Sequence, residues 1–367
     1  MLPLIYLFAR LLFASRKYAM MAMVLMAADF MHFTQTRIAT IDVYAVFFIM
    51  LMFYFMKRYM SMNFYKQKLW RTLLPLFGSG LFFGIGVSSK WIVLYGGAGL
   101  AIMLAMSLYS RYKECVAAKR QLDGSTLDLQ QEDEKLYVEI TRTFVKKTLI
   151  TLGSCIVFFI IIPVIIYAVS YIPALSATDQ GFTIENLIQA QKDMFDYHSH
   201  LVGSHPFAST WWEWPFMKRP VWFYGESGGA SGLGANHVSS IVTMGNPLIW
   251  WCGFLALAAV MWISIRRKDQ RIYVIWIAYL SQYVPWMLVS RETFLYHYFA
   301  MIPFLILAIV YIAKVAEDRW PKIRWARYIY VGLLIALFIA FYPVLSGMEV
   351  SSEYVEHVLR WFPSWVF

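Results

Sequence analysis

Ten long apolar runs constrain this chain of 367 residues more than any other feature. A membrane-spanning helix needs roughly 20 mostly apolar residues, and the run 148–170 contains no charged residue. Apolar residues make up 60% of the chain and charged residues 15%, whereas soluble domains have about 25% charged residues. The sequence therefore predicts an all-α polytopic membrane protein. The predicted helices cover 1–14, 18–34, 38–56, 73–88, 91–108, 148–170, 245–265, 272–290, 298–316 and 327–347.

Lys and Arg are unevenly distributed between alternate connections, which predicts the orientation in the membrane. One set of connections carries 25 of the 32 basic residues, and we expect it to be cytoplasmic. It includes 109–147, whose mixed-charge run predicts a solvated helix. The net charge of +10 is thus a topology signal, and nucleic-acid binding is not expected. All seven histidines fall on or near the opposite, outer face: His32, His198, His200, His205, His237, His297 and His357.

The topology divides the chain into four parts. These are an N-terminal bundle (1–170), an extracytoplasmic loop (171–244), C-terminal membrane helices (245–347) and an outer interfacial tail (348–367). Within the loop, 184–201 is amphipathic and predicts a helix lying on the membrane surface. The glycine-rich stretch 225–234 is expected to be a flexible turn that follows no strand, so it is not a nucleotide-binding motif. The expected location is the cell membrane, with the active face outside the cytoplasm.

Three outer turns each present one fixed cation: Arg37, Lys90 and Arg291. Convergent cations are what a phosphate group needs. The alternative is that each cation pairs with lipid headgroups or with a carboxylate such as Asp42 or Glu292. Spacing alone leaves both interpretations open.

Polar residues also occur at helical spacing in the second predicted span. Asp29, His32 and Thr36 recur at i, i+3 and i+7, so a continuous helix would present them on one face.

The stretch 195–224 is the most informative part of the outer loop. It holds three of the seven histidines and four of the fifteen tryptophans, so it favours a rigid cover with a binding surface. The alternative is an interfacial aromatic belt. His198 and His200 lie at i, i+2 and do not face one another on a helix, and the three cysteines show no metal-ligand or disulfide spacing. We therefore predict no metal site and no cofactor.

Four segments, in order, resemble the protein O-mannosyltransferase family: DFMHFTQTRIATIDVYAVFF, GIGVSSKWIVLY, HPFASTWWEWPFMKRPVWFY and PWMLVSRETFLYHYFAMIPFL. The resemblance covers essentially the whole chain and implies a bacterial-type integral-membrane glycosyltransferase. It implies transfer of mannose from a polyprenyl-phosphate-mannose donor to Ser or Thr hydroxyls of an acceptor protein, with inversion at the anomeric carbon. On this interpretation Arg37, Lys90 and Arg291 bind the lipid phosphate. The acceptor or sugar site is formed by His205, Trp211, Trp212, Glu213 and Trp214.

The family also carries an Asp-Glu pair in its first outer loop, which positions or deprotonates the acceptor hydroxyl. This sequence has no outer Asp-Glu dipeptide, since Asp133 and Glu134 are on the cytoplasmic side. We therefore expect a truncated or split form that lacks the N-terminal portion and needs the missing segment or a partner subunit. Its catalytic base is not identified, and Glu213 is the weaker hypothesis for that role.

Two other classes of function stay open. One is a non-catalytic membrane subunit that binds lipid-linked sugar or peptide, and the other is a glycosyltransferase with a lipid acceptor. A transporter is disfavoured, because the sequence shows no inverted repeats and no paired broken helices.

Overall fold

The computed structural model describes residues 1–124, 131–177, 181–200, 203, 205–228 and 233–367. These residues form two compact units, each described by itself. The first unit comprises Met1–Phe47 and Ile184–Phe367, and the second comprises Phe48–Thr183. The boundary falls inside helix α4 (Ile41–Met60). The sequence divided the chain into four parts by their expected side of the membrane, and that division stays a prediction.

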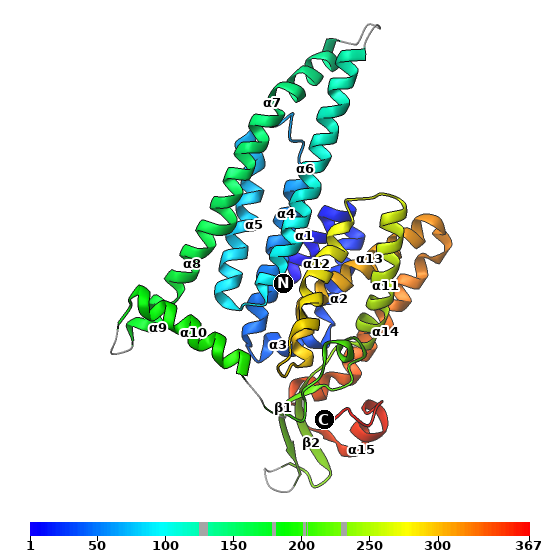
Figure 1. Ribbon diagram of the computed structural model, residues 1–367. Coiled ribbons are helices and arrows are strands. Elements are labelled where there is room, and N and C mark those ends of the chain that lie inside the picture. Colours follow the sequence, from blue (N-terminus) through cyan, green and yellow to red (C-terminus); the bar gives the residue numbers. More distant parts are fainter. Residues whose placement is uncertain (125–130, 178–180, 201–202, 204, 229–232) are drawn as a thin grey trace. The chain divides into compact units, whose positions relative to one another are not determined.

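The elements follow the chain as shown in Figure 1. The first unit contains α1 (Leu2–Phe13), α2 (Arg16–Ala27), α3 (Phe30–Arg37), the start of α4, α10 (Ile184–His200), the 3-10 helix η2 (Trp211–Phe216), β1 (Val221–Ser227), β2 (His237–Thr243), α11 (Pro247–Arg266), α12 (Tyr273–Tyr283), η3 (Val284–Leu288), η4 (Leu295–Met301), α13 (Ile302–Arg319), η5 (Pro321–Ile323), α14 (Arg324–Ser346), β3 (Val350–Ser351), α15 (Ser352–Tyr354) and η6 (Val355–Leu359). The second unit contains the rest of α4, α5 (Leu69–Ser89), α6 (Val93–Gly124), α7 (Gln131–Ile156), the π-helix η1 (Val157–Ile161), α8 (Ile162–Ser170) and α9 (Ile172–Ser176).

The chain is a multi-pass membrane protein. In the described part of the chain, six helical segments are long and apolar enough to cross a bilayer: Leu69–Ser89, Val93–Gly124, Glu132–Ser176, Pro247–Arg266, Leu295–Arg319 and Pro321–Ser346. The segment Glu132–Ser176 keeps large apolar side chains exposed, including Leu149, Ile160 and Val164 at 58–62%. Such exposure is stable where lipid replaces water as the solvent. The count of ten spans and their exact limits stay predictions.

Helix α13 forms the core of the first unit. Every residue from Ile302 to Val310 is buried, and α13 packs against α2, α11 and α12. A helix that is apolar on all sides is stable only when other elements surround it. The short η4 turn leads into it, so this helix begins at Ile302, whereas the sequence predicted 298–316 as one helix. Similarly, the predicted helix 272–290 ends at Tyr283 and continues as η3.

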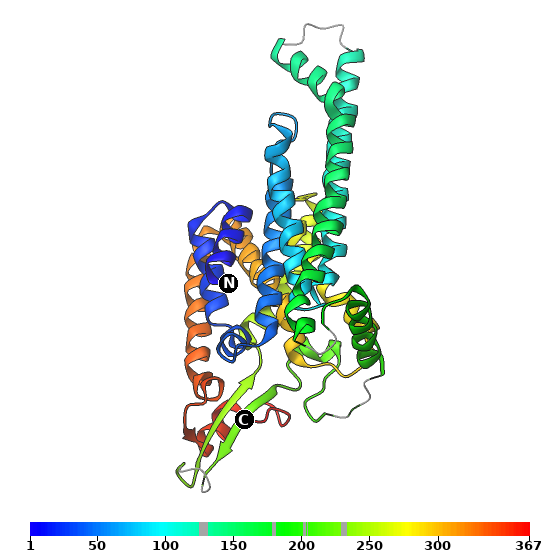
Figure 2. The ribbon, with the colours of Figure 1, turned by 90° about the vertical axis from the view of Figure 1, so that its left-hand side faces the viewer.

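A small antiparallel sheet lies in the first unit, in the order β1-β2-β3. The chain is mostly helical, as the sequence predicted, but the expectation that no strand precedes the glycine-rich stretch was wrong. Residues 221–227 form β1, and the following stretch connects it to β2, with 229–232 outside the described residues. Strand β2 packs on α3 and α14, whereas the β1–β2 hairpin projects from the helices of its unit (Figures 1 and 2).

The predicted helix 18–34 is interrupted between α2 and α3. Asp29 has an extended backbone, and its Oδ1 accepts a hydrogen bond of 2.9 Å from the His32 backbone N–H. This is the N-cap geometry that begins a new helix. The prediction that Asp29, His32 and Thr36 share one face of a continuous helix is thus wrong, because Asp29 caps α3 instead of continuing α2.

Close helix packing defines the second unit, where α5 contacts η1 and α8. Glycines allow this approach: a Cβ atom at Gly80 would lie 2.3 Å from the Phe158 carbonyl oxygen, and one at Gly84 would lie 2.9 Å from the Pro163 Cα. Small residues at such spacing let membrane helices pack backbone to backbone. Helices α6 and α7 pair as a long antiparallel hairpin (Figure 2).

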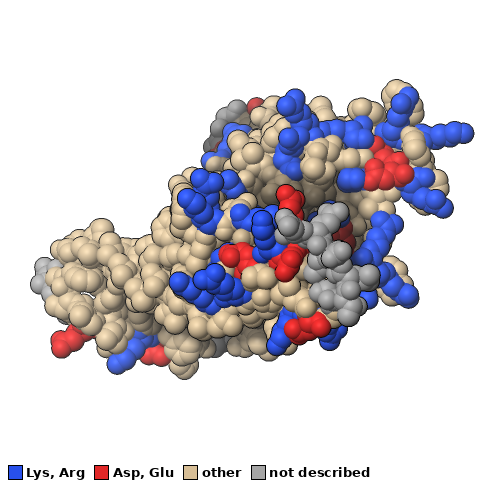
Figure 3. All heavy atoms as spheres, turned by 90° about the horizontal axis from the view of Figure 1, so that it is seen from above, with Lys and Arg blue, Asp and Glu red and all other residues tan. Residues whose placement is uncertain are grey.

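An ion cluster ties three helices at one end of the first unit. Glu317 of α13 accepts hydrogen bonds from Lys17 at 2.7 Å, from the Tyr18 hydroxyl at 3.1 Å and from Arg327 of α14 at 2.7 Å. Many Lys and Arg side chains are visible in the view from above in Figure 3. Because Glu317 is shared between two cations, it joins α2 and α14 to the central helix α13.

Candidate functional site

Two segments that are far apart in sequence, and that the sequence predicts to be outer, lie side by side in the first unit. The backbone N–H of His205 donates to Glu292 Oε1 at 2.8 Å. Ser209 N–H donates to the Thr293 carbonyl at 2.8 Å, and the Thr293 hydroxyl donates to the Ser209 carbonyl at 2.7 Å. These three hydrogen bonds join residues 205–209 to the connection between η3 and η4. We call the residues 205–209 and 291–297 the outer junction.

Aromatic packing makes the outer junction rigid. His297 is buried, its ring centroid lies 4.4 Å from that of Trp286, and it stacks on Trp214 at 6.0 Å. The Trp214 indole N–H donates to the Ser209 carbonyl at 3.1 Å. Buried aromatic pairs with satisfied polar groups contribute both area and orientation. The junction therefore rests on a packed aromatic base.

Arg291 lies in this junction and is half-buried. Its guanidinium is within electrostatic range of His198 on α10 and of the Tyr296 phenol. Partial burial and the nearby Arg291 charge both lower the pKa of His198. Because the pKa of His198 is lowered, its protonated form is disfavoured beside the charge of Arg291.

Arg37 is the last residue of α3 and is exposed to solvent. Its guanidinium lies 5.8 Å from the centroid of the Phe33 ring. Asp42, in the first turn of α4, is buried and lies within electrostatic range of the same Tyr296 phenol as Arg291. The α3–α4 turn and the outer junction thus approach one another through Tyr296. Lys90, the third predicted cation, is the C-cap residue of α5 and belongs to the second unit.

The five residues predicted to form an acceptor or sugar site have different surroundings. Trp214 is fully buried, and Trp211 accepts a hydrogen bond of 2.9 Å on its carbonyl from the Tyr283 hydroxyl. Trp212 is 51% exposed. His205 is exposed and contacts the Phe294 ring at 5.2 Å. Of the five, His205 and Trp212 have side chains that a ligand could reach, whereas Trp214 is buried and packs against His297 of the junction.

Glu213 has a structural function that the sequence analysis missed. Its Oε2 accepts hydrogen bonds of 2.9 Å from the backbone and hydroxyl of Thr210, which completes a capping box on η2. Its Oε1 pairs with Lys218 at 2.5 Å. Burial raises the pKa of Glu213, but the bonds from Lys218 and Thr210 outweigh it and hold the pKa below its usual value. A carboxylate held as an anion in this way is a weaker base, which argues against Glu213 as the group that deprotonates an acceptor.

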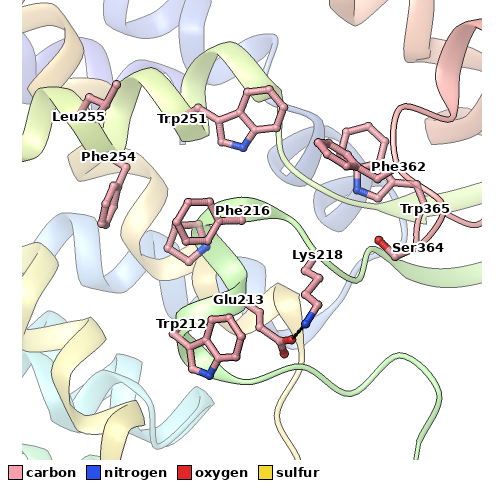
Figure 4. Close-up of a pocket in the computed structure, with 11 residues that line it drawn as sticks. Trp212, Glu213, Phe216, Lys218, Trp251, Phe254, Leu255, Phe362, Ser364 and Trp365 are labelled. Carbon is pink, nitrogen blue, oxygen red and sulfur yellow. Dashed lines mark hydrogen bonds and ion pairs between the residues drawn. The ribbon is translucent and has the colours of Figure 1, made fainter.

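A pocket of about 600 Å³ lies beside this ion pair (Figure 4). Its walls come from η2, from the first half of α11 and from the C-terminal segment, with Trp212, Trp251 and Trp365 among the lining residues. Trp365 is fully buried and its indole N–H donates to the Met217 carbonyl at 2.8 Å. The C-terminal segment, for which the sequence indicated only an interfacial position, therefore forms part of this wall.

In the described part of the chain, no three His, Cys, Asp or Glu side chains come together in a way that would hold a metal ion. The candidate site consists of cations, aromatic rings and backbone hydrogen bonds. Its chemistry suits the binding of an anion and of an apolar or extended ligand.

Comparison with known proteins covers nearly the whole chain. The family model described as dolichyl-phosphate-mannose-protein mannosyltransferase matches residues 1–176, and the one described as the C-terminal four-transmembrane region of protein O-mannosyltransferase matches residues 183–365. Two relatives are the polyprenol-phosphate-mannose–protein mannosyltransferases of Mycolicibacterium smegmatis and Corynebacterium glutamicum. Each is 24% identical, over 97% of this chain and 73% of the relative.

A solved structure gives the same result for the fold. The Saccharomyces cerevisiae protein O-mannosyltransferase Pmt1–Pmt2 complex bound to the sugar donor matches with a TM-score of 0.74 at 12% identity. The match covers 100% of this chain and 79% of that one. The two family models adjoin with a gap of only a few residues and appear in the order expected of one protein. The chain belongs to the protein O-mannosyltransferase family.

Proposed function

We propose that this chain transfers mannose from polyprenol-phosphate-mannose to Ser or Thr hydroxyls of an acceptor protein. The observation that carries the proposal is the alignment of 97% of the chain with relatives that bear this activity in their names. The multi-pass membrane character suits a lipid-linked donor. The relative distribution of Lys and Arg supports an active face outside the cytoplasm.

In the proposed reaction the acceptor oxygen attacks the anomeric carbon of mannose. The bond from that carbon to the phosphate oxygen breaks, polyprenyl phosphate leaves as an anion, and a carboxylate takes the hydroxyl proton. Attack from the side opposite the phosphate inverts the configuration. Fixed cations stabilise the leaving phosphate, because negative charge develops there in the transition state.

Arg37 and Arg291 are the proposed phosphate cations of the first unit, and Lys90 is proposed for the same role from the second. Support comes from their surroundings: Arg37 ends α3, Arg291 lies in the connection between η3 and η4, and neither forms an ion pair with another described residue. The accessible His205 and Trp212 side chains are proposed to contact the sugar or the acceptor. The proton acceptor is proposed to be an Asp-Glu pair of the kind that the family carries, supplied by another polypeptide segment or by a partner subunit.

The test is transfer of radiolabelled mannose from polyprenyl-phosphate-mannose to a peptide rich in Ser and Thr, with the protein in native membranes. Arg37→Ala and Arg291→Ala should each reduce turnover roughly 10- to 100-fold, the effect of losing one charge-assisted hydrogen bond to phosphate. Lys192→Ala on α10 is the matched control, since it removes an exposed outer cation with no predicted role. Equal activity of all three variants would contradict the assignment of the two arginines.

The alternative is a non-catalytic subunit that binds lipid-linked sugar or peptide. It is favoured by the absence of an outer Asp-Glu dipeptide from the sequence. Donor binding without transfer, converted to transfer by a second chain that carries the pair, would support this alternative.

A further inference from the structure

Strand β1 lies at the edge of its sheet. It pairs with β2 on one side, in the order β1-β2-β3. Among the described residues, the backbone of 222–226 forms no hydrogen bond other than those to β2. The other side of the strand therefore presents unpaired N–H and C=O groups, which are a template for an additional strand.

This free edge carries three consecutive aromatic residues. Trp222, Phe223 and Tyr224 are 40%, 43% and 41% exposed. The Trp222 indole lies closely over Gly225, where a Cβ would come within 1.8 Å of the Trp222 Cζ2. Exposed aromatic residues with restricted orientation are typical of surfaces that bind another protein.

The edge also leads directly to the outer junction. The Phe223 ring lies 6.3 Å from the ring of Tyr296, and Tyr296 is within electrostatic range of Arg291. A chain lying along β1 would therefore reach the cation proposed to hold the donor phosphate. No other strand edge in the described part of this unit has such a connection, since β2 is the central strand and β3 has two residues.

We propose that an extended segment of the acceptor protein, containing the target Ser or Thr, pairs with the free edge of β1. The proposal rests on the proposed function. Pairing through main-chain groups binds many sequences with similar affinity, because every residue except proline offers the same N–H and C=O groups. Such recognition suits an enzyme whose acceptors share hydroxyl groups and not a sequence. The aromatic side chains would cover alternate side chains of the acceptor.

The register of the sheet limits how long this pairing is. The pairing of β1 with β2 shifts between Trp222 and Tyr224, so Phe223 forms a bulge. Bulges on edge strands interrupt regular pairing and oppose aggregation. A short usable edge holds a substrate weakly enough for release after transfer.

The deciding experiment is a scan of N-methyl groups along a peptide acceptor with a single Thr. An N-methyl group removes one backbone donor without changing a side chain. In a paired strand only every second residue directs its N–H toward the partner. Methylation at alternate positions should therefore lower kcat/KM about 10-fold or more, whereas the positions between them should change it less than about 3-fold. An effect without alternation, or no effect, would overturn the proposal.

A protein variant provides an independent readout. Phe223→Ser should raise the KM for the peptide several-fold and leave the KM for the lipid donor unchanged. Phe195→Ser on α10 is the matched control, because Phe195 is an exposed aromatic residue outside the sheet, at 63% exposure. Equal peptide KM values for the two variants would contradict binding at β1.

Photo-cross-linking separates this inference from the proposed function. Benzoylphenylalanine at position 224 should cross-link the peptide whether or not mannose is transferred. Transfer to the unmethylated peptide without any cross-link refutes the strand-pairing proposal alone. Absence of transfer together with a cross-link refutes the proposed function and leaves an acceptor-binding surface.

Discussion

Asp29 links the start of α3 to α11, and its replacement should be costly. Its Oδ1 caps α3 through the His32 N–H at 2.9 Å, and its Oδ2 accepts from the Trp250 indole N–H at 3.1 Å. Loss of an N-cap costs about 1 kcal/mol. A buried indole N–H left without a partner costs about 1–3 kcal/mol. Because both Asp29 and Trp250 are fully buried, Asp29→Ala should lower the free energy of unfolding by about 2–4 kcal/mol.

A double-mutant cycle with Trp250→Phe tests this reasoning in mixed micelles. Trp250→Phe removes the donor that Asp29→Ala would leave unpaired, so the double variant should be less destabilised than the sum, by about 1–2 kcal/mol. Asp29→Asn should cost less than Asp29→Ala, since asparagine is also a good N-cap. Asparagine, however, carries an NH₂ donor in place of one carboxylate oxygen, so it cannot accept at both the Oδ1 and the Oδ2 position. Purely additive effects, with a coupling below about 0.5 kcal/mol, would refute the account.

Two more predictions concern packing and pH. Gly80→Ala should destabilise the second unit by more than about 2 kcal/mol, because the added Cβ would overlap the Phe158 carbonyl. Gly153→Ala is the control and should change thermal stability little, because nothing lies within 4 Å of the added Cβ. Equal melting temperatures for the two variants would contradict this packing argument. The folded-state pKa of Glu213 is lowered, so its contribution is present above the ordinary value of 4.5 and is lost as pH falls through the folded-state pKa. Glu213→Gln should therefore flatten the acid limb of the melting temperature against pH, and a profile identical to that of the unmodified chain would contradict the role of the Lys218 pair.

The sequence located four of the helices closely, because the position of an apolar helix depends mainly on length and apolar content. The runs that became α4, α5, α11 and α14 were located to within several residues at each end. The interruption at Asp29 was missed, since an N-cap residue is recognised by its local backbone and not by hydropathy.

The hairpin and Glu213 show a different kind of error. A run rich in Val, Trp, Phe and Tyr that ends in Gly and Ser is also the signature of a strand, but in a membrane protein the same residues suit an interfacial belt. Thr210 and Glu213 stand three residues apart, which is the capping-box pattern, and this signal was available in the sequence. Trp214 is buried because it packs against Trp286 and His297, whereas Trp212 is exposed. No local sequence pattern encodes this difference in exposure.

The outer junction holds two segments, 205–209 and 291–297, next to one another. Neither 205–209 nor the connection before η4 forms regular structure, so each alone would sample many conformations. The hydrogen bonds between Ser209 and Thr293 join the two segments, and the buried stack of Trp214 on His297 packs beneath them. Arg291 and His205 thus belong to two segments that hydrogen bonds join directly. Positioning of this kind would suit the proposed transfer to a hydroxyl, because the reacting groups must be oriented before the bond to phosphate breaks.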